Sequence, residues 1–415
     1  MATVKPNTSK SRLGGEHAAD ISGTALNQVE TFDTFSCNVP ITNPKTPDLI
    51  TQQTLPLGMK LVECERKFFS SNLVMPDGSK VEIWAFEDPR QKDAAKRFQF
   101  PSAPIIVHKG DLVHTILKSS KNSHTIHHHG IEPTPMNDGV GHTSFEVTGS
   151  YTYQWRATEC GSFFYHCHKN TALHVEMGMY GMLTVLPKES EHVRTDGKFR
   201  FNAFPPIPED TLISDAVLAT SFGTIPSETR DALRAYDVEA IWVADEMDPV
   251  WHKLNHNAGL CGEDAGLNNF NPKHFLISGV PFHQQGLKKG RPFAPNPKNL
   301  ELVNTTAMLG QTVLIRFTHA GYTVLRIDVP NNLEVVLIED SGRQYGSEHS
   351  PYSTPFMGNN PLSADSTTPG TITPARRTTG LVRAKSPGRY EFKFSYLHWI
   401  TGKELGVAIA SITFT

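Results

Sequence analysis

A short stretch around one cysteine, Tyr165-His166-Cys167-His168, constrains this chain more than any other part of it. His174 follows shortly after, and Met179 comes five residues after His174. A soft thiolate, two imidazoles and a weak axial thioether in fixed geometry are the ligands of a copper ion that exchanges single electrons. Cys167, His174 and Met179 provide three of these four ligands, so the stretch predicts a copper site of this kind.

The fourth ligand is expected from an earlier strand. The run Ser123-His124-Thr125-Ile126-His127-His128-His129-Gly130 lies upstream and offers several imidazoles. We take His124 as the fourth ligand.

The two histidines that flank the cysteine predict a second metal site. Neighbouring side chains of an extended strand point to opposite faces. His166 and His168 are therefore expected to face away from the Cys167 copper, where they can hold another metal. The backbone that joins them to Cys167 would then connect the two sites covalently.

At these residues the chain resembles the superfamily of multicopper oxidases and copper nitrite reductases. His-Cys-His, a following histidine and a methionine five residues later are shared with the blue-copper domains of that superfamily. The upstream run contains the oxidase pattern His-x-x-His-x-His-Gly, as His124, His127, His129 and Gly130. In the nitrite reductases, a blue-copper histidine and a second-copper histidine are five residues apart, as His124 and His129 are here. The gap between Cys167 and His174 is longer than in laccases and shorter than in nitrite reductases.

The resemblance continues more weakly toward the C-terminus. Residues 269–275 look like a signature of the second domain of multicopper oxidases, and Glu404-Leu405-Gly406 matches the segment before the last strand in both families. Tyr396-Leu397-His398-Trp399 stands where a blue-copper domain has its cysteine, so this region is not expected to bind a blue copper. The resemblance implies that His398 completes the second copper site of a neighbouring subunit in a homotrimer.

Composition and pattern favour an all-β fold of two cupredoxin-like Greek-key β-sandwich domains. The 415 residues include 31 glycines and 29 prolines, and helical periodicity is scarce. We expect an N-terminal arm at 1–50, a first domain with the blue (type 1) copper site at 51–187, a linker at 188–234 and a second domain at 235–415. Residues 105–107 and 112–117, joined by Lys109-Gly110-Asp111, are predicted to form a hairpin.

Other strands are predicted from alternating or continuous apolar residues. They are expected around 81–85, 151–155, 163–168, 182–186, 241–243, 275–279, 312–317, 322–329, 333–338, 389–396 and 407–414. A short helix is expected at 227–234, and a long loop at 345–374.

Two counts of metal ligands compete. A trinuclear oxygen-reducing cluster needs four His-x-His pairs, and this chain has two, His127/His129 and His166/His168. A mononuclear second copper needs about three imidazoles, which His129, His166 and His398 can provide. His127 stands where the nitrite reductases have an acid/base aspartate, so it is our candidate catalytic proton donor as well as a candidate ligand.

Three functions follow from these counts. The preferred one is a copper oxidoreductase that passes electrons from a small-molecule or protein donor through the type 1 copper to a second histidine-bound copper, where O₂ is reduced in a laccase-like reaction. The first alternative is a nitrite reductase-like enzyme that forms nitric oxide. The second is a blue-copper electron carrier without activity, whose second site is degenerate.

Several nearby residues have simpler explanations. Met177 is an alternative axial ligand or a core methionine. His128 and His142 are expected in solvent or loops, and His319 is expected to bind no metal. Cys37, Cys64, Cys160 and Cys261 could form two disulfides.

The overall charge excludes some partners and leaves the location open. The formal net charge is −3 and the pI about 6.7, so we expect neither nucleic acid nor a membrane as a partner. The N-terminus has no apolar signal segment, and we expect a periplasmic or secreted mature form, with the cytoplasm as the alternative.

Overall fold

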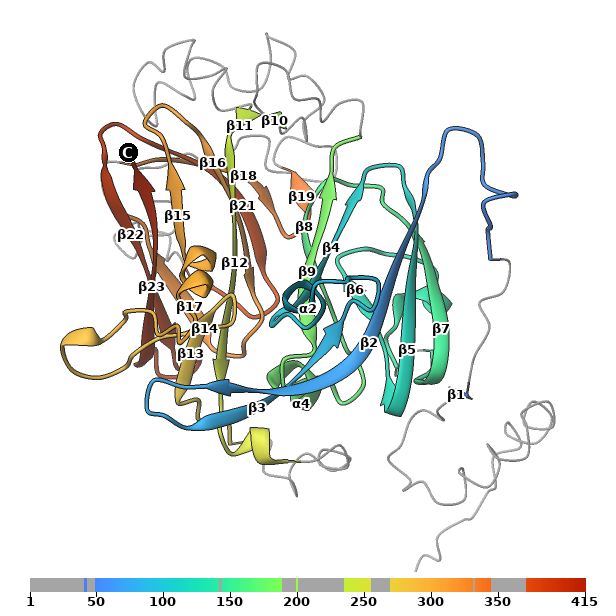
Figure 1. The fold of residues 1–415 in the computed structure, drawn as a ribbon, viewed down its shortest axis with the longest axis horizontal. Coiled ribbons are helices and arrows are strands. Elements are labelled where there is room, and N and C mark those ends of the chain that lie inside the picture. The colour runs from blue at the N-terminus through green and yellow to red at the C-terminus, as the bar shows by residue number, and fades with distance from the viewer. Residues whose placement is uncertain are drawn as a thin grey trace, which may run out of the picture.

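A computed structural model describes residues 41–42, 49–141, 144–188, 199–200, 235–254, 269–330, 333–344 and 371–415. Over these residues the chain consists mostly of strands arranged as two β-sandwiches side by side (Figure 1). The all-β prediction is confirmed. The expected helix at 227–234, His142, Cys37, Cys261 and most of the arm, the linker and the 345–374 loop lie outside the described residues. In the described ranges, no helix is long and apolar enough to cross a membrane.

The first sandwich packs a five-stranded sheet against a four-stranded one. The first sheet has the order β1-β7-β5-β2-β3, and the second has the order β4-β9-β8-β6. The strands are β1 Ile41–Thr42, β2 Leu61–Val74, β3 Lys80–Glu87, β4 Ser102–His108, β5 Leu112–His124, β6 His127–His129, β7 Val147–Arg156, β8 Gly161–His166 and β9 Tyr180–Leu186, with short helices α2 Ala94–Arg97, α3 Pro135–Asp138 and α4 Thr171–Glu176.

The second sandwich packs a seven-stranded sheet, β14-β13-β12-β16-β21-β18-β19, against a five-stranded one, β15-β23-β22-β17-β20. A two-stranded ribbon, β10-β11, lies beside it. The strands are β10 Phe199–Arg200, β11 Ala235–Tyr236, β12 Val238–Met247, β13 His274–Ile277, β14 Val280–Pro281, β15 Asn304–Ala307, β16 Val313–His319, β17 Val324–Asp328, β18 Leu333–Asp340, β19 Arg343–Gln344, β20 Thr371–Ile372, β21 Arg377–Ala384, β22 Gly388–Leu397 and β23 Glu404–Phe414; 3₁₀ turns occur at Trp251–Lys253, Gly286–Lys288 and Pro297–Leu302.

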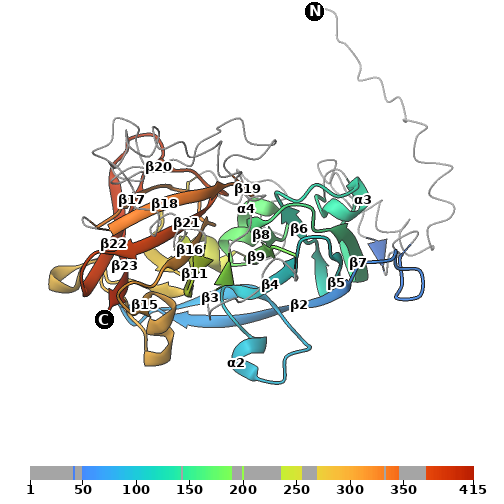
Figure 2. The same cartoon turned by 90° about the horizontal axis from the view of Figure 1, so that it is seen from above.

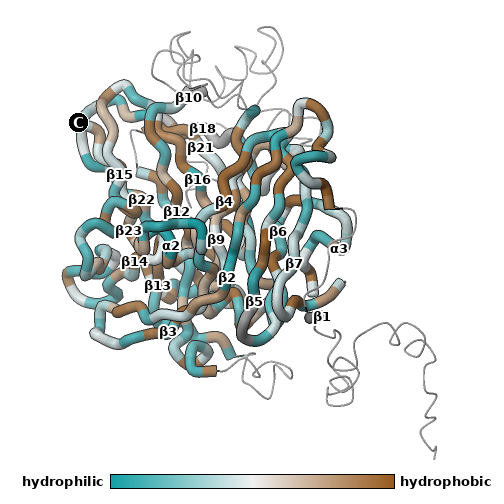
Figure 3. The backbone as a smooth tube through the Cα atoms, turned by 45° about the vertical axis from the view of Figure 1, so that its right-hand side comes forward, coloured by the Kyte–Doolittle hydropathy of each residue, from teal (hydrophilic) through white to brown (hydrophobic). Residues whose placement is uncertain are grey.

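Each core forms between the two facing sheets because every second side chain of a strand points inward. In β7 the alternating residues Tyr151, Tyr153 and Trp155 are buried, as predicted. In the second sandwich, Trp242 of β12 packs edge-on against Phe392 and Phe394 of β22. Figure 3 shows apolar stretches along strands such as β4 and β16, whereas α2 is hydrophilic.

The predicted hairpin of 105–107 and 112–117 is wrong. β4 pairs with β9, whereas β5 pairs with β2 and β7, so the two strands belong to different sheets. The turn between them carries the chain across the sandwich, and the Asp111 carboxylate accepts a hydrogen bond from the His108 N–H at 2.8 Å. Local alternation and a turn signal cannot distinguish this crossover from a hairpin.

The β2–β3 hairpin extends along both sandwiches (Figures 1 and 2). Its far end packs Val81, Ile83 and Ala85 against Met247 and Leu276 of the second sandwich. The two units are therefore joined by an apolar contact in addition to the covalent chain.

A buried carboxyl group also connects the two sandwiches. Glu339 of β18 accepts hydrogen bonds from the Ser162 N–H of β8 at 3.1 Å and from the Thr379 hydroxyl, and Ser162 Oγ lies 2.7 Å from Thr379 Oγ1. Burial raises the pKa of Glu339 to about 7, although the nearby Arg377 opposes this shift. The carboxyl group is therefore more easily ionised in the unfolded chain than in the folded one.

Glu339 should make stability depend on pH. The pKa of Glu339 is about 4.5 in the unfolded chain and about 7 in the folded one. Its contribution to the free energy of unfolding is therefore complete below pH 4.5 and is lost as the pH rises to about 7, a change of about 3 kcal/mol. Glu339→Gln should remove this loss, so the unfolding midpoint of the wild type should fall more than that of the variant between about pH 5 and pH 8. Glu132→Gln at an exposed position is the control, and parallel profiles of wild type and Glu339→Gln would contradict the assignment.

Candidate metal centres

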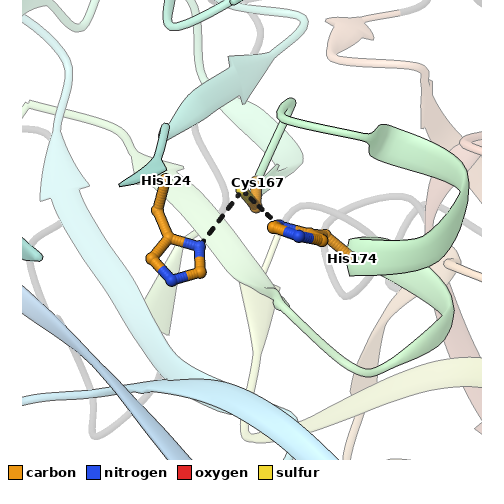
Figure 4. A group of neighbouring side chains, drawn as sticks. All are labelled: His124, Cys167 and His174. Atoms are coloured by element: carbon orange, nitrogen blue, oxygen red, sulfur yellow. Dashed lines mark hydrogen bonds between the residues drawn. The ribbon is translucent and has the colours of Figure 1, made fainter. Parts of the chain in front are cut away.

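The first group of candidate ligands surrounds Cys167 inside the first sandwich. Cys167 follows β8, His124 is the last residue of β5, and His174 lies in the last turn of α4. Cys167 Sγ lies 3.1 Å from His174 Nδ1 and 3.8 Å from His124 Nδ1 (Figure 4). All three side chains are fully buried, and their candidate ligand atoms lie within 4.8 Å of one another. One ion placed between them could contact all three.

The backbone around these residues brings Met179 to the same loop. Cys167 N–H donates to Met179 C=O at 3.0 Å, and Met179 N–H donates to His174 C=O at 2.9 Å. Met177 is fully buried too, but its C=O accepts from Trp84 N–H of β3 at 2.8 Å. Of the two methionines, it is therefore Met179 whose backbone is hydrogen-bonded to Cys167.

Aromatic rings cover both imidazoles of this group. Phe68 stacks on His124 with ring centres 5.0 Å apart, and Trp84 meets His174 edge-on at 5.5 Å. Both rings belong to the β2–β3 hairpin. Such a shell excludes water and fixes the orientation of the ligand rings, which are the properties that tune a thiolate–metal centre.

Burial raises the pKa of the Cys167 thiol to about 11, and the Thr125 N–H, 3.5 Å from Sγ, opposes the shift. Without a metal the sulfur is therefore protonated at neutral pH. Because a metal binds the thiolate, binding must displace this proton. A buried thiol between two imidazole nitrogens fits the donor set of a thiolate copper site.

The second group lies on the paired strands β6 and β8. His127 is directly opposite His166 in this antiparallel pair, and His129 Nδ1 lies 3.3 Å from His166 Nε2. Candidate ligand atoms of these three residues lie within 4.8 Å of one another. His168 lies beside the group, with its ring centre 5.3 Å from that of His127, and its Nδ1 is 3.0 Å from Thr171 Oγ1.

Burial keeps two imidazoles of the second group neutral. It lowers the pKa of His129 to about 3, with the charge of Arg377 acting in the same direction, and it places the pKa of His166 well below its usual value. A neutral imidazole has a lone pair for a metal ion. Several such rings with converging nitrogens fit a histidine-bound metal.

Asp138 is a functional candidate that sequence reasoning missed. His127 Nδ1 lies 2.8 Å from the Asp138 carbonyl oxygen and 3.2 Å from its Oδ1. Both neighbours are acceptors, so Nδ1 carries the proton and Nε2 is left for a metal or a substrate. The close approach of the Asp138-Gly139 turn to the strand that carries His127 requires a glycine. Gly139 has a φ of 71°, and a Cβ there would lie 1.8 Å from the Ile126 carbonyl oxygen. The Asp138-Gly139 pair at the end of α3 was the available signal.

Three other histidines of the described residues belong to neither group. His398 follows β22, and its Nδ1 accepts from Ile400 N–H at 3.2 Å and from Thr401 N–H at 3.3 Å. His128 was expected in solvent or a loop, but it is fully buried beside Trp155 because it points to the opposite face of β6 from its two neighbours. His319 is buried, and its Nε2 lies 2.8 Å from Thr323 C=O. Cys64 is a free thiol in the described part of the chain.

Comparison with known proteins agrees with this geometry. The sequence profile of a family described as "Multicopper oxidase" matches residues 84–190, which contain both groups of ligands. Residues 84–190 are thus similar to a multicopper oxidase domain. The resemblance to the superfamily of multicopper oxidases and copper nitrite reductases is thereby confirmed.

Curated relatives match only part of this chain and part of their own length. Laccase abr2 of Aspergillus fumigatus is 35% identical over 96 residues, which are 22% of this chain and 16% of the laccase. A copper-containing nitrite reductase of Neisseria meningitidis is 25% identical over 130 residues, which are 31% of each protein. The matches thus cover less than a third of either relative.

Solved structures resemble the chain beyond residues 84–190. A blue copper oxidase from Nitrosomonas europaea aligns with a TM-score of 0.55 and 17% identity, covering 86% of each chain. A copper nitrite reductase from the same organism aligns with a TM-score of 0.51 and 17% identity, covering 86% of this chain and 94% of the other. These likenesses establish the cupredoxin-like fold of both sandwiches.

Removing the Asp138 side chain should weaken the second group. Asp138→Ala should lower metal affinity there by about 10-fold to 100-fold, because His127 loses a partner that fixes its tautomer. Asp138→Asn keeps an acceptor oxygen and should change affinity less. The affinities of both variants are measured by titrating metal-free protein with Cu²⁺ and monitoring the signal of the histidine-bound metal. Equal affinity in Asp138→Ala and wild type would show that the backbone carbonyl alone orients His127.

Proposed function

We propose that this chain is a copper oxidoreductase with two copper sites. His124, Cys167, His174 and Met179 hold a type 1 copper, and His127, His129 and His166 hold a second copper, with His168 beside it. When bound, the first copper exchanges single electrons and the second offers a position for an electron acceptor. The two histidine groups of the multicopper oxidase domain and its family support this assignment.

One observation carries the proposal: neighbouring residues belong to different groups. The Cys167 side chain lies with His124 and His174, whereas His166 lies with His127 and His129. The peptide bond between them is the shortest covalent connection between the two groups. It needs no moving part and keeps the separation of the sites constant. Such an arrangement suits transfer of single electrons between two fixed centres.

His127 has an alternative role in the proposal: when its Nε2 does not bind the metal, that nitrogen can carry a proton to the acceptor. Its side chain is 15% exposed, whereas His166 is buried inside the sandwich, so His127 can exchange protons with water. Asp138 holds the imidazole ring of His127 through Nδ1, so Nε2 faces His129 and His166. Each electron delivered to O₂ to form water requires one proton, and reduction of nitrite to nitric oxide and water takes two protons with one electron.

The preferred acceptor is O₂, and the alternative is nitrite. Two His-x-His pairs in the first domain, as in oxygen-reducing oxidases, favour O₂. The match to a copper-containing nitrite reductase, longer than the laccase match, favours nitrite. A donor protein or small molecule supplies the electrons in both cases.

A neighbouring copy of the chain is proposed to complete the second site. His398 lies apart from both histidine groups of its own chain, beside Trp399 and Ile400, which are 71% and 69% exposed. An exposed apolar pair of this kind is suited to a subunit contact. We propose a homotrimer in which domains 51–187 and 235–415 of neighbouring copies meet, and a periplasmic or secreted location.

Copper content per chain, measured together with the electron paramagnetic resonance spectrum, tests this function. About two coppers per chain are expected, one with the narrow hyperfine splitting of a thiolate site and one with an ordinary spectrum. One copper with only the thiolate signal would instead indicate an electron carrier. Turnover with O₂ or with nitrite then identifies the acceptor.

Cys167→Ser is the decisive variant for the first site. Loss of the sulfur should abolish the visible colour and the turnover, while the ordinary copper signal stays because His127, His129 and His166 are unchanged. Cys160→Ser, at another buried cysteine, is the matched control and should retain both properties. Turnover that persists in Cys167→Ser would contradict electron transfer through this residue.

A further inference from the structure

Helix α4 carries a ligand of the first group but is held by the second domain. It spans Thr171–Glu176 and lies between Cys167 and Met179, with His174 in its last turn. At its beginning, the Tyr322 hydroxyl of the second domain lies within donating distance of Ala172 C=O, at 2.8 Å, and of Thr171 C=O, at 3.2 Å. A single hydroxyl group of another domain thus holds the first turn of the helix.

The second domain also holds the end of α4. Glu176 is fully buried, and its Oε1 accepts a hydrogen bond from the Asp248 N–H at 2.6 Å. Shortly after the helix, Tyr180 donates from its hydroxyl to Asp245 Oδ2 at 2.6 Å. Residues 171–180, which include His174 and Met179, are therefore bonded to the second domain at three points.

The second domain presents these groups from a rigid support. The ring of Tyr322 packs against Phe270 at 5.6 Å and Trp251 at 6.2 Å, and these two rings meet at 5.0 Å. The backbone N–H of Tyr322 also donates to the Glu246 carboxylate. Side chains locked by packing and hydrogen bonds hold a partner in position more firmly than mobile surface groups.

A helix this short cannot fix its own position. Isolated helices of fewer than about 12 residues are marginal in water, so contacts with the rest of the protein must determine where α4 lies. The separation of His174 Nδ1 from Cys167 Sγ follows from that position. Thr171 at the other end contacts His168 beside the second group, so a shift of the helix would reach both groups.

We propose that the second domain sets the geometry of the thiolate copper site through α4, with Tyr322, Asp248 and Glu176 as positioning residues. This inference rests on the proposed function, because it concerns the same site. It gives the second domain, which has Tyr396-Leu397-His398-Trp399 where a blue-copper domain has its cysteine, a role in the copper site of the first. It also explains the length of the segment between Cys167 and His174, because this segment contains the first turn of α4, which the second domain holds.

Tyr322→Phe tests the inference because it removes only the hydroxyl group. Copper-loaded full-length protein should show an altered hyperfine splitting of the thiolate copper, a shifted reduction potential and at least about 10-fold faster copper release to a chelator, since supporting contacts of metal ligands affect affinity on this scale. Tyr390→Phe is the matched control. Its hydroxyl donates to Ser386 C=O at 2.7 Å within the second domain, so the copper signals should stay those of the wild type.

Two substitutions of Glu176 test the other end of the helix. Glu176→Ala removes the acceptor of the Asp248 N–H and should change the splitting and the copper release in the same direction as Tyr322→Phe. Glu176→Gln keeps an acceptor oxygen in the same place and should restore the wild-type values. Circular dichroism of each variant verifies that the fold is retained.

The outcomes separate this inference from the function on which it rests. A wild-type protein that shows no thiolate copper signal would overturn the proposed function. A normal wild-type signal that Tyr322→Phe and Glu176→Ala both leave unchanged would overturn only the positioning role. Equal changes in Glu176→Gln and Glu176→Ala would refute the hydrogen bond from Asp248 as the means of positioning.

Discussion

The antiparallel pairing of β6 with β8 is the constraint on which the rest of the site depends. It places His127 opposite His166 and brings His129 Nδ1 within 3.3 Å of His166 Nε2. Because side chains alternate along extended backbone, the next residue, Cys167, points to the other group. One strand end therefore serves two sets of ligands, and neither set could shift in register without disturbing the other.

The two sandwiches share an architecture but have different roles at the site. The first provides all the residues of both histidine groups, whereas the second supports them. Its Glu339 accepts from the backbone of β8 four residues before His166, and its Tyr322 contacts the helix that carries His174. The β2–β3 hairpin adds an apolar contact between the same two units. The second sandwich thus contacts the segments that carry the candidate ligands without providing a residue of either group.

Sequence patterns predicted the strands well and their connections less well. The alternating Tyr151, Tyr153 and Trp155 indicated β7 because burial of one face leaves a period of two in the sequence. The same rule failed for 105–117, since it describes each strand but not the sheet to which the strand belongs. Helix α4 was missed because its few residues carry no helical period. Asp138 was missed because its contact with His127 Nδ1 depends on a turn that folds residues 135–139 back against β6.

The sequence by itself determined which donor groups this protein can offer a metal: a cysteine, imidazoles and a thioether at set spacings can be read directly, because ligand preference is a property of residue type. It also determined that adjacent residues would face different sites, because alternation is local. Only the tertiary structure decided which histidines meet. It placed His128 in the core, His398 apart from both groups, and Asp138 beside His127. Alternation along β6 shows that His128 faces away from its neighbours, but which face meets the core, and where His398 lies, depend on contacts between segments distant in the chain.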